Sequence, residues 1–241
     1  MGMIKTKNEI KLLKKSAQIT NSCIKIIENS LKENITEKEL RKRVDRKIRS
    51  QRASLAFQTL VACGKRSSII HPKPYATCKR IRGIGYIDFG ARYKGYRTDI
   101  TVPFIKGKIN KKERKIIETT IMAYHIAVSS IKLNQPCWVL FQKVNSCLKK
   151  NGFQMSHGLG HGLGLNIHEY PSIIMPRKKK LIGKRKRRWE KIKKMLFQKN
   201  MIFTIEPGIY VKGVGGCRIE NDILLTAKGP KILTNSKLIE I

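Results

Sequence analysis

The chain has 241 residues, 41% of them hydrophobic, which is enough for one packed domain and argues against wholesale disorder. No stretch approaches 18 apolar residues and the first ten residues are mostly polar or charged, so we expect no membrane span and see no secretory signal. The 52 Lys and Arg residues against 16 Asp and Glu give a net charge of +36, a field that attracts polyanions.

Two further features of the composition bear on where the chain works. The six cysteines contain no CxxC pair, so we expect neither a zinc ribbon nor a disulfide framework, and we place the chain in a reducing cytoplasm. The basic residues are spread over the whole chain, which favours a lysine-biased composition over a dedicated nucleic-acid site. Gly2 and Thr6 fit the loose N-myristoylation pattern, which is too short to decide the question.

The first half of the chain reads as helices followed by strands. Apolar residues at helical spacing predict a helix over 7–32. Thr36 and Glu39 have the spacing of a capping box and predict a second helix that runs to about Gln51. The pattern then predicts three strands, separated by a proline-containing loop and by a turn over 90–95: 57–62, 85–89 and 96–105.

The same order repeats in the second half. Helices are expected over 112–132 and 138–150, then a glycine-rich loop over 156–164 and strands over 201–211 and 217–226. The repetition predicts two similar halves about a pseudo-twofold axis, in a single α+β domain over 1–241. Twelve of the eighteen residues in 177–194 are basic, which indicates a surface insertion or a short basic helix.

Each half ends in strands that carry two isolated acids, Asp88 with Asp99 and Glu206 with Glu220. A carboxylate on a buried strand is unfavourable unless a cation neutralises it. One such acid is usually part of an ion pair, but four in matching places exceed what one arginine can neutralise. The pattern therefore predicts that acids from both halves meet around divalent cations.

Three of the five histidines, His157, His161 and His168, lie within a segment of twelve residues that is rich in glycine. Glycines leave the backbone free to approach a site closely. Imidazole together with carboxylates suits Mn, Co, Fe or Zn, whereas a structural zinc site would use thiolates.

The order of these motifs resembles the pita-bread metallopeptidase family (M24), which contains methionine aminopeptidases, Xaa-Pro aminopeptidases and prolidases. The resemblance rests on Asp88 and Asp99, GHGLGL around His161, TIEPGIY around Glu206 and RIEND around Glu220. It covers nearly the whole chain apart from the basic insertion. It implies two pseudo-symmetric helix-helix-strand halves around a curved antiparallel sheet.

The residues within these motifs resemble those of the Xaa-Pro branch of this family. The likeness lies in the segments DFGARYKGYRTDIT, HGLGHGLGLNIHEYP and GGCRIEND. The segment VACGKRSSIIHPKP resembles the loop that carries the branch's first active-site histidine, which is His71 in this chain. Three departures stand against it. The family's extra N-terminal domain is expected to be absent, Thr101-Val102-Pro103-Phe104 replaces a usual Thr-Arg-Thr-Phe, and the insertion lengthens the interval from His161 to Glu206.

The resemblance implies two divalent ions per chain, which lower the pKa of a water between them. The implied ligands are Asp88 on one ion, His161 and Glu206 on the other, and Asp99 with Glu220 on both.

The resemblance also implies roles around these ligands. Glu206 would carry a proton to the departing amine, and His71 and His168 would bind the scissile carbonyl and the oxyanion. His157 would shape the proline-side pocket, and Arg218 would orient Glu220.

We therefore expect hydrolysis of the N-terminal peptide bond of small peptides, of the Xaa-Pro aminopeptidase or dipeptidase type. One alternative is a methionine aminopeptidase, and another is a non-catalytic member of the fold that binds nucleic acid or ribosomes. A homodimer, and weak nonspecific contact of the basic surface with nucleic acid or ribosomes, stay open.

Overall fold

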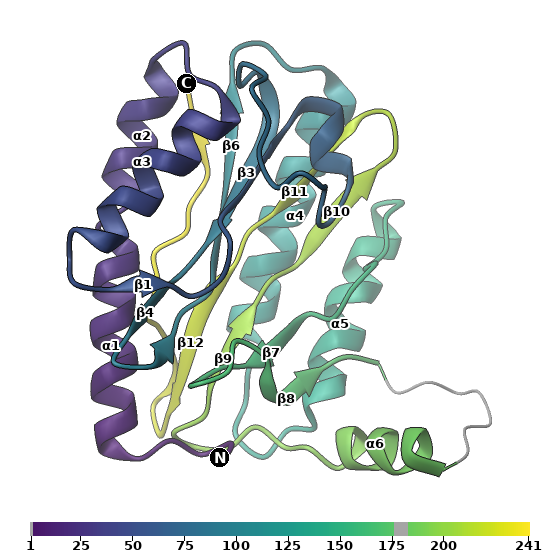
Figure 1. Cartoon of the computed structure of the whole chain (residues 1–241). Coiled ribbons are helices and arrows are strands. Elements are labelled where there is room, and N and C mark those ends of the chain that lie inside the picture. Colours follow the sequence, from purple (N-terminus) through teal and green to yellow (C-terminus); the bar gives the residue numbers. More distant parts are fainter. Residues whose placement is uncertain (1, 176–182) are drawn as a thin grey trace.

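The computed structural model describes residues 2–175 and 183–241, except for the side chains of residues 184, 185 and 188. Figure 1 shows helices packed along an extended set of strands. The helices are α1 Lys7–Asn21, α2 Ile24–Lys32, α3 Glu37–Arg49, α4 Lys111–Ser129, α5 Cys137–Lys150 and α6 Gly183–Lys193, with the 3-10 turn η1 Gly64–Ser68. The strands are β1 Ser54–Leu55, β2 Leu60–Cys63, β3 Gly83–Phe89, β4 Ala91–Tyr93, β5 Tyr96–Arg97, β6 Ile100–Lys106, β7 Gly160–Gly162, β8 Glu169–Ile173, β9 Ile202–Ile205, β10 Gly208–Val211, β11 Gly215–Arg218, β12 Asn221–Thr226, β13 Gly229–Ile232 and β14 Ile239–Glu240.

Two larger sheets form the centre of the molecule. One has the order β14-β6-β3-β2 and the other β13-β12-β9-β7-β8, and their strand pairs are antiparallel except for β14 with β6. An isolated antiparallel bridge pairs Thr101 with Glu220, and the Glu220 N–H donates to the Thr101 carbonyl at 3.1 Å. The two sheets therefore meet at a seam that contains one of the predicted ligands.

Each half has its own hydrophobic core. Leu40 and Val44 of α3 pack in one cluster with Phe104 of β6, whereas Leu140 and Val144 of α5 pack in another. Figure 1 shows α1, α2 and α3 to the left of the central strands, α4 behind them and α5 to their right. The expected α+β arrangement of two helix-helix-strand halves is confirmed. None of the described helices is long and apolar enough to span a bilayer.

The helix starts follow their capping residues. The predicted capping box of Thr36 and Glu39 is present at the start of α3. The predicted helix over 7–32 is wrong as a single element, because the chain breaks between α1 and α2. There the Ser22 hydroxyl donates to the Ile19 carbonyl at 2.6 Å and the Cys23 N–H donates to the Thr20 carbonyl at 3.0 Å, so local bonds replace the helical pattern.

Three of the four isolated acids lie where predicted strands are interrupted. Asp99 precedes β6, Glu206 lies between β9 and β10, and Glu220 lies between β11 and β12, whereas Asp88 lies within β3. Pro207, which has no N–H for the ladder, follows Glu206 directly. The continuous strands predicted over 96–105, 201–211 and 217–226 are therefore wrong.

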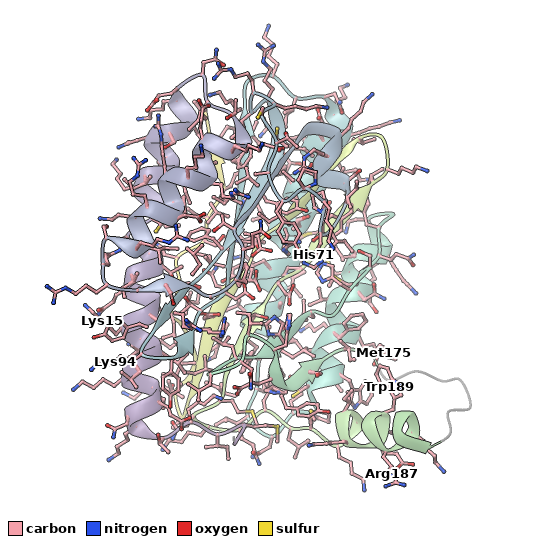
Figure 2. The ribbon with its side chains drawn as sticks, viewed as in Figure 1. Lys15, His71, Lys94, Met175, Arg187 and Trp189 are labelled. Carbon is pink, nitrogen blue, oxygen red and sulfur yellow. The ribbon has the colours of Figure 1, made fainter. Side chains whose placement is uncertain are left out.

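The basic insertion is only partly described. Its first part falls on 176–182, which lies outside the described residues, and its remainder forms α6. Ile192 is buried, and the Lys191 ammonium lies 4.3 Å from the centroid of the Tyr170 ring on β8. Figure 1 shows α6 at the lower edge of the molecule, and Figure 2 shows Arg187 on it pointing outward.

Candidate metal centre

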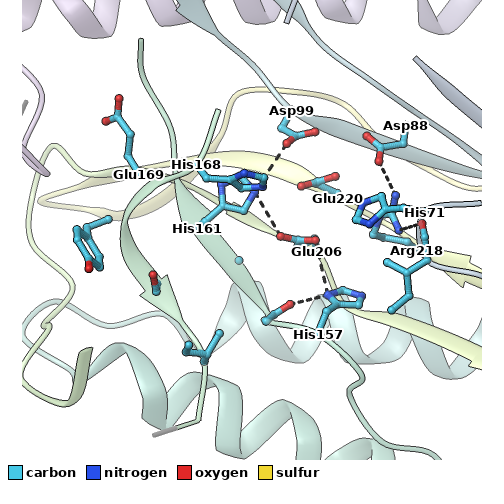
Figure 3. Close-up of a pocket in the computed structure, with 16 residues that line it drawn as sticks. His71, Asp88, Asp99, His157, His161, His168, Glu169, Glu206, Arg218 and Glu220 are labelled. Atoms are coloured by element: carbon cyan, nitrogen blue, oxygen red, sulfur yellow. Dashed lines mark hydrogen bonds and ion pairs between the residues drawn. The ribbon is translucent and has the colours of Figure 1, made fainter. Parts of the chain in front are cut away.

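A pocket of about 460 Å³ opens between the two halves and has a volume typical of small-ligand sites. Figure 3 shows its acidic and imidazole side chains converging on one region. The lining residues with acidic, imidazole or guanidinium side chains are His71, Asp88, Asp99, His157, His161, His168, Glu169, Glu206, Arg218 and Glu220. The structure thus brings together every side chain that the sequence predicted for this site.

The tightest group consists of Asp99, His161 and Glu220, whose ligand atoms all lie within 4.8 Å of one another. Glu206 adjoins this group, with its Oε1 atom 3.5 Å from His161 Nε2. Asp88 approaches from β3, where it pairs in register with Thr101. These side chains come from both sheets, so the cluster forms only when the two halves pack together.

Burial leaves the acids of the cluster with little water to stabilise their charge. Asp99 is 6% exposed and Glu220 is 2% exposed. Burial and the neighbouring Glu220 carboxylate raise the pKa of Asp99 well above its ordinary value, and burial and Glu206 do the same for the pKa of Glu220. Burial raises the pKa of Glu206 to about 7. The cluster therefore needs protons or a cation to neutralise it.

His161 faces these acids without a charge of its own. Burial and the nearby His168 lower the pKa of His161 to about 3, so the ring is neutral at pH 7. Its Nδ1 atom lies 3.0 Å from the Gly162 carbonyl, and if Nδ1 donates the ring N–H to that carbonyl, Nε2 carries the lone pair. That lone pair faces Asp99 Oδ2 at 3.7 Å and Glu206 Oε1 at 3.5 Å.

Two glycines allow His161 to take this position. A Cβ atom at Gly160 would lie 1.9 Å from the Thr204 carbonyl oxygen, and one at Gly162 would lie 2.0 Å from the Tyr170 carbonyl oxygen. β7 therefore packs against β9 and β8 only because its residues on both sides of His161 lack side chains.

A divalent cation fits this donor set. The Asp88 Oδ1 atom is buried and has no hydrogen-bond partner among the described residues. Together with His161 Nε2 and the acids around it, this atom belongs to a set of oxygen and imidazole donors, and no lysine is among the described residues that line the pocket. Such a set suits transition-metal or zinc ions rather than a thiolate-bound structural zinc.

Arg218 is buried at 2% exposure and organises one side of the cluster. Its Nη2 atom donates to Asp88 Oδ2 at 2.5 Å, and its Nε atom donates to the Thr101 hydroxyl at 2.9 Å. That hydroxyl donates in turn to Glu220 Oε2 at 2.7 Å. The sequence predicted that Arg218 orients Glu220, and in the structure the guanidinium pairs directly with Asp88 and reaches Glu220 through Thr101.

Tyr210 connects this network to His157. Its hydroxyl accepts from Arg218 Nη1 at 2.7 Å and lies 3.1 Å from His157 Nε2. His157 Nδ1 lies 2.7 Å from the Gly158 carbonyl. If Nδ1 carries the ring proton toward that carbonyl, Tyr210 donates to Nε2, and the imidazole is held at both nitrogens. Burial lowers the pKa of His157 to about 4, so this ring is neutral.

The remaining histidines lie toward the opening of the pocket. His71 is exposed but lines the pocket on the side of Arg218. The His168 ring stands edge-on to His161, with 4.2 Å between their centroids. Burial lowers the pKa of His168, which favours the neutral ring as a hydrogen-bond donor.

Some polar groups of the site were not predicted. Thr101 and Tyr210 make the contacts given above, and buried Asp222 accepts from the Asp99 N–H at 3.3 Å through Oδ2. Tyr210 and Asp222 lie inside the motifs TIEPGIY and RIEND, so their closeness to predicted ligands was the available signal. Thr101 gave none, because hydroxyls are common on strands.

The two sheets and the carboxylate–imidazole cluster between them have the arrangement of the pita-bread metallopeptidase fold. The model of metallopeptidase family M24 matches residues 11–227, and the chain belongs to that family.

Three known proteins show the extent of the similarity. The chain is 33% identical to the Xaa-Pro dipeptidase of Pyrococcus furiosus, over 98% of this chain and 64% of that protein. The solved prolidase of Pyrococcus horikoshii is 32% identical, with a TM-score of 0.86, over 98% of this chain and 64% of that one. The solved Xaa-Pro dipeptidase of Bacillus anthracis is 31% identical, with a TM-score of 0.87, over 99% of this chain and 64% of that one. The chain thus spans a little under two thirds of the length of these relatives.

Proposed function

We propose that this chain hydrolyses the N-terminal peptide bond of small peptides in which proline is the second residue. The observation that carries this proposal is the buried group of Asp99, His161 and Glu220, whose ligand atoms lie within 4.8 Å of one another. Relatives named Xaa-Pro dipeptidase support the choice of substrate.

Five residues would hold two divalent cations: Asp88, Asp99, His161, Glu206 and Glu220. Two ions are favoured over one because the four acids Asp88, Asp99, Glu206 and Glu220 supply about the charge that a pair of divalent cations needs. When bound, such ions lower the pKa of a water between them and supply a nucleophile at neutral pH.

The chain's own side chains would move the protons. Glu206, whose pKa burial raises to about 7, is suited to take a proton from the attacking water and return it to the departing amine. The Thr204 hydroxyl donates to Glu206 Oε1 at 3.4 Å and so helps to orient the carboxylate.

The histidines would bind the substrate. His71 and His168 line the pocket from different segments, so they can donate to the scissile carbonyl and to the oxyanion that develops from it. His157, fixed by Tyr210 and the Gly158 carbonyl, would form the wall beside the proline ring.

The substrate choice is tested with metal-reconstituted protein and three dipeptides, Ala-Pro, Ala-Ala and Met-Ala. We expect turnover of Ala-Pro at least tenfold above Ala-Ala, on the order of the discrimination that one pocket contact supplies. Preference for Met-Ala would identify a methionine aminopeptidase instead. No turnover of any of the three, with Mn, Co, Fe or Zn supplied, would contradict the proposal.

We also propose that the chain works in the cytoplasm, the reducing environment expected for six cysteines without a CxxC pair.

A further inference from the structure

Lys5 is a buried cation that the mechanism above does not use. It is 2% exposed, which is rare for lysine without a partner, and its Nζ atom lies 2.7 Å from Glu169 Oε2. The side chains of this ion pair are 1% and 10% exposed. Glu169 lines the pocket and directly follows His168.

The backbone around Lys5 is fixed to the second half of the molecule. The Lys5 N–H donates to the Asn200 carbonyl at 2.9 Å, and Ile4 forms an antiparallel bridge with Met201. Directly after Lys5, the capping box of Thr6 and Glu9 starts α1. The ammonium is therefore presented from a rigid segment that approaches the pocket wall from outside.

Glu169 uses its carboxylate on the outer side of the pocket. Figure 3 shows that carboxylate pointing away from Asp99, Glu206 and Glu220. While Oε2 pairs with Lys5, Oε1 accepts from the Asn166 N–H at 3.1 Å. A Cβ atom at Gly164 would lie 2.8 Å from both Glu169 Oε1 and Lys5 Nζ, so the loop backbone packs directly on the ion pair.

The loop over 163–168 joins His161 to His168 and is anchored in the core at one end, where Leu163 is fully buried and packs with Leu13 of α1. Residues 164–168 carry no fully buried apolar side chain, and Leu165 is 38% exposed. Arg97 supplies two bonds from outside the loop: its backbone N–H donates to the Gly164 carbonyl at 2.8 Å, and its Nε donates to the Leu165 carbonyl at 2.9 Å. The order of residues 164–168 therefore depends on such polar contacts and on the bonds to Glu169.

We propose that Lys5 is a positioning residue, which holds the 163–168 loop closed through Glu169 and thereby fixes His168 relative to His161. The ammonium neutralises Glu169 and draws its carboxylate outward. The Glu169 side chain can then organise the loop, and its carboxylate stays apart from the acids that would bind cations.

The first test needs no substrate, so its outcome does not depend on the proposed peptidase activity. Hydrogen exchange of the 163–168 amides is followed in metal-free protein, in the wild type, Lys5→Met, Glu169→Gln and the control Lys7→Met. Lys7 is exposed and forms no ion pair among the described residues. Lys7→Met therefore removes the same positive charge as Lys5→Met without breaking an ion pair. We expect about tenfold faster loop exchange in the first two variants and wild-type exchange in β3 and β6. Unchanged loop exchange in both variants would overturn the inference.

The kinetic arm rests on the proposed function and uses the metal-loaded protein. Lys5→Met and Glu169→Gln should lower kcat for Ala-Pro about tenfold, with KM within about twofold, since a displaced His168 weakens transition-state binding. The double variant Lys5→Met/Glu169→Gln should be no worse than Lys5→Met, because it leaves no unpaired buried charge.

The outcomes separate the two proposals. A purely structural role predicts a lower Tm, faster exchange throughout the fold and kcat near that of the Lys7→Met control, and this result would overturn the inference. An inactive wild type with the expected loop exchange would remove the peptidase proposal and keep the role of Lys5.

Discussion

The acids that line the pocket fall into two groups. Asp88 is paired with Arg218 and Glu169 with Lys5, whereas Asp99, Glu206 and Glu220 have no Lys or Arg ion-pair partner among the described residues. This contrast is informative because the chain carries 52 cationic residues. Because a protein so rich in lysine and arginine leaves these acids without an ammonium or guanidinium partner, we expect a cation from outside the chain to neutralise them.

The largest effect is expected at an acid without a protein cation. Asp99→Asn should lower kcat/KM for Ala-Pro by at least about a thousandfold, because it removes one member of a group that acts as a unit. The fold should persist, since a neutral amide relieves the repulsion from Glu220. Steady-state kinetics with excess metal measure kcat/KM, and circular dichroism measures whether the fold persists. The control is Glu118→Gln, a substitution at an exposed residue. Turnover near the wild-type value would remove Asp99 from the site.

A second prediction concerns a histidine outside the acid cluster. His71→Ala should lower kcat about a hundredfold, as loss of an oxyanion donor does, while the bound metal per chain stays at the wild-type value. Kinetics and elemental analysis of the dialysed protein measure the two quantities. Lost metal would place His71 among the ligands instead.

A third prediction uses pH to sharpen the contrast. Glu206 has a pKa of about 7 in the metal-free fold, against 4.5 as its ordinary value, so the folded state binds more protons than the unfolded one. Its contribution to the free energy of unfolding is therefore complete below pH 4.5 and is lost as the pH rises through 7. Urea unfolding of metal-free protein should show this loss in the wild type and a smaller loss in Glu206→Gln. If the free energy of unfolding changed with pH in the same way in the wild type and in Glu206→Gln, the assignment to Glu206 would be contradicted. Added Mn should restore the stability of the wild type at pH 7.

The smallest effect is expected on the outer surface. RNA should bind weakly, with an affinity that falls steeply between 50 and 200 mM salt. Figure 2 shows Lys15 and Lys94 on the side of the molecule opposite Arg187. If α6 makes the contacts, Lys186→Gln/Arg187→Gln should weaken binding about threefold more than Lys15→Gln/Lys94→Gln in fluorescence anisotropy. Equal losses would assign the binding to net charge alone.

The motifs predicted the contents of the site better than its geometry. Asp88, Asp99, Glu206 and Glu220 could be named from the sequence because acids are scarce in this chain and lie in predicted strands, and His161 could be named because its motif resembles the M24 family. The interruptions of the strands at Asp99, Glu206 and Glu220 could not be predicted, since hydrophobic alternation does not reveal a single kink. The short strands β8, β13 and β14 were missed because fewer than six residues give too little periodicity.

Contacts between distant segments were also beyond the sequence. Lys5 and Glu169 lie 164 positions apart, and Thr101 and Glu220 lie 119 apart. Nothing in the local pattern distinguishes Lys5 from the lysines around it. Only the fold, which brings the segment before α1 against the residues just before β9, shows that this lysine is buried.

The seam between Thr101 and Glu220 has a consequence for how the protein matures during synthesis. A nascent chain that ends at residue 106 already contains Asp88 and Asp99, yet it lacks His161, Glu206 and Glu220. Cation capture therefore waits until translation has passed residue 220 and the second sheet has docked on the first. Uptake of the ions would then report completed assembly, and a truncated translation product would remain without them.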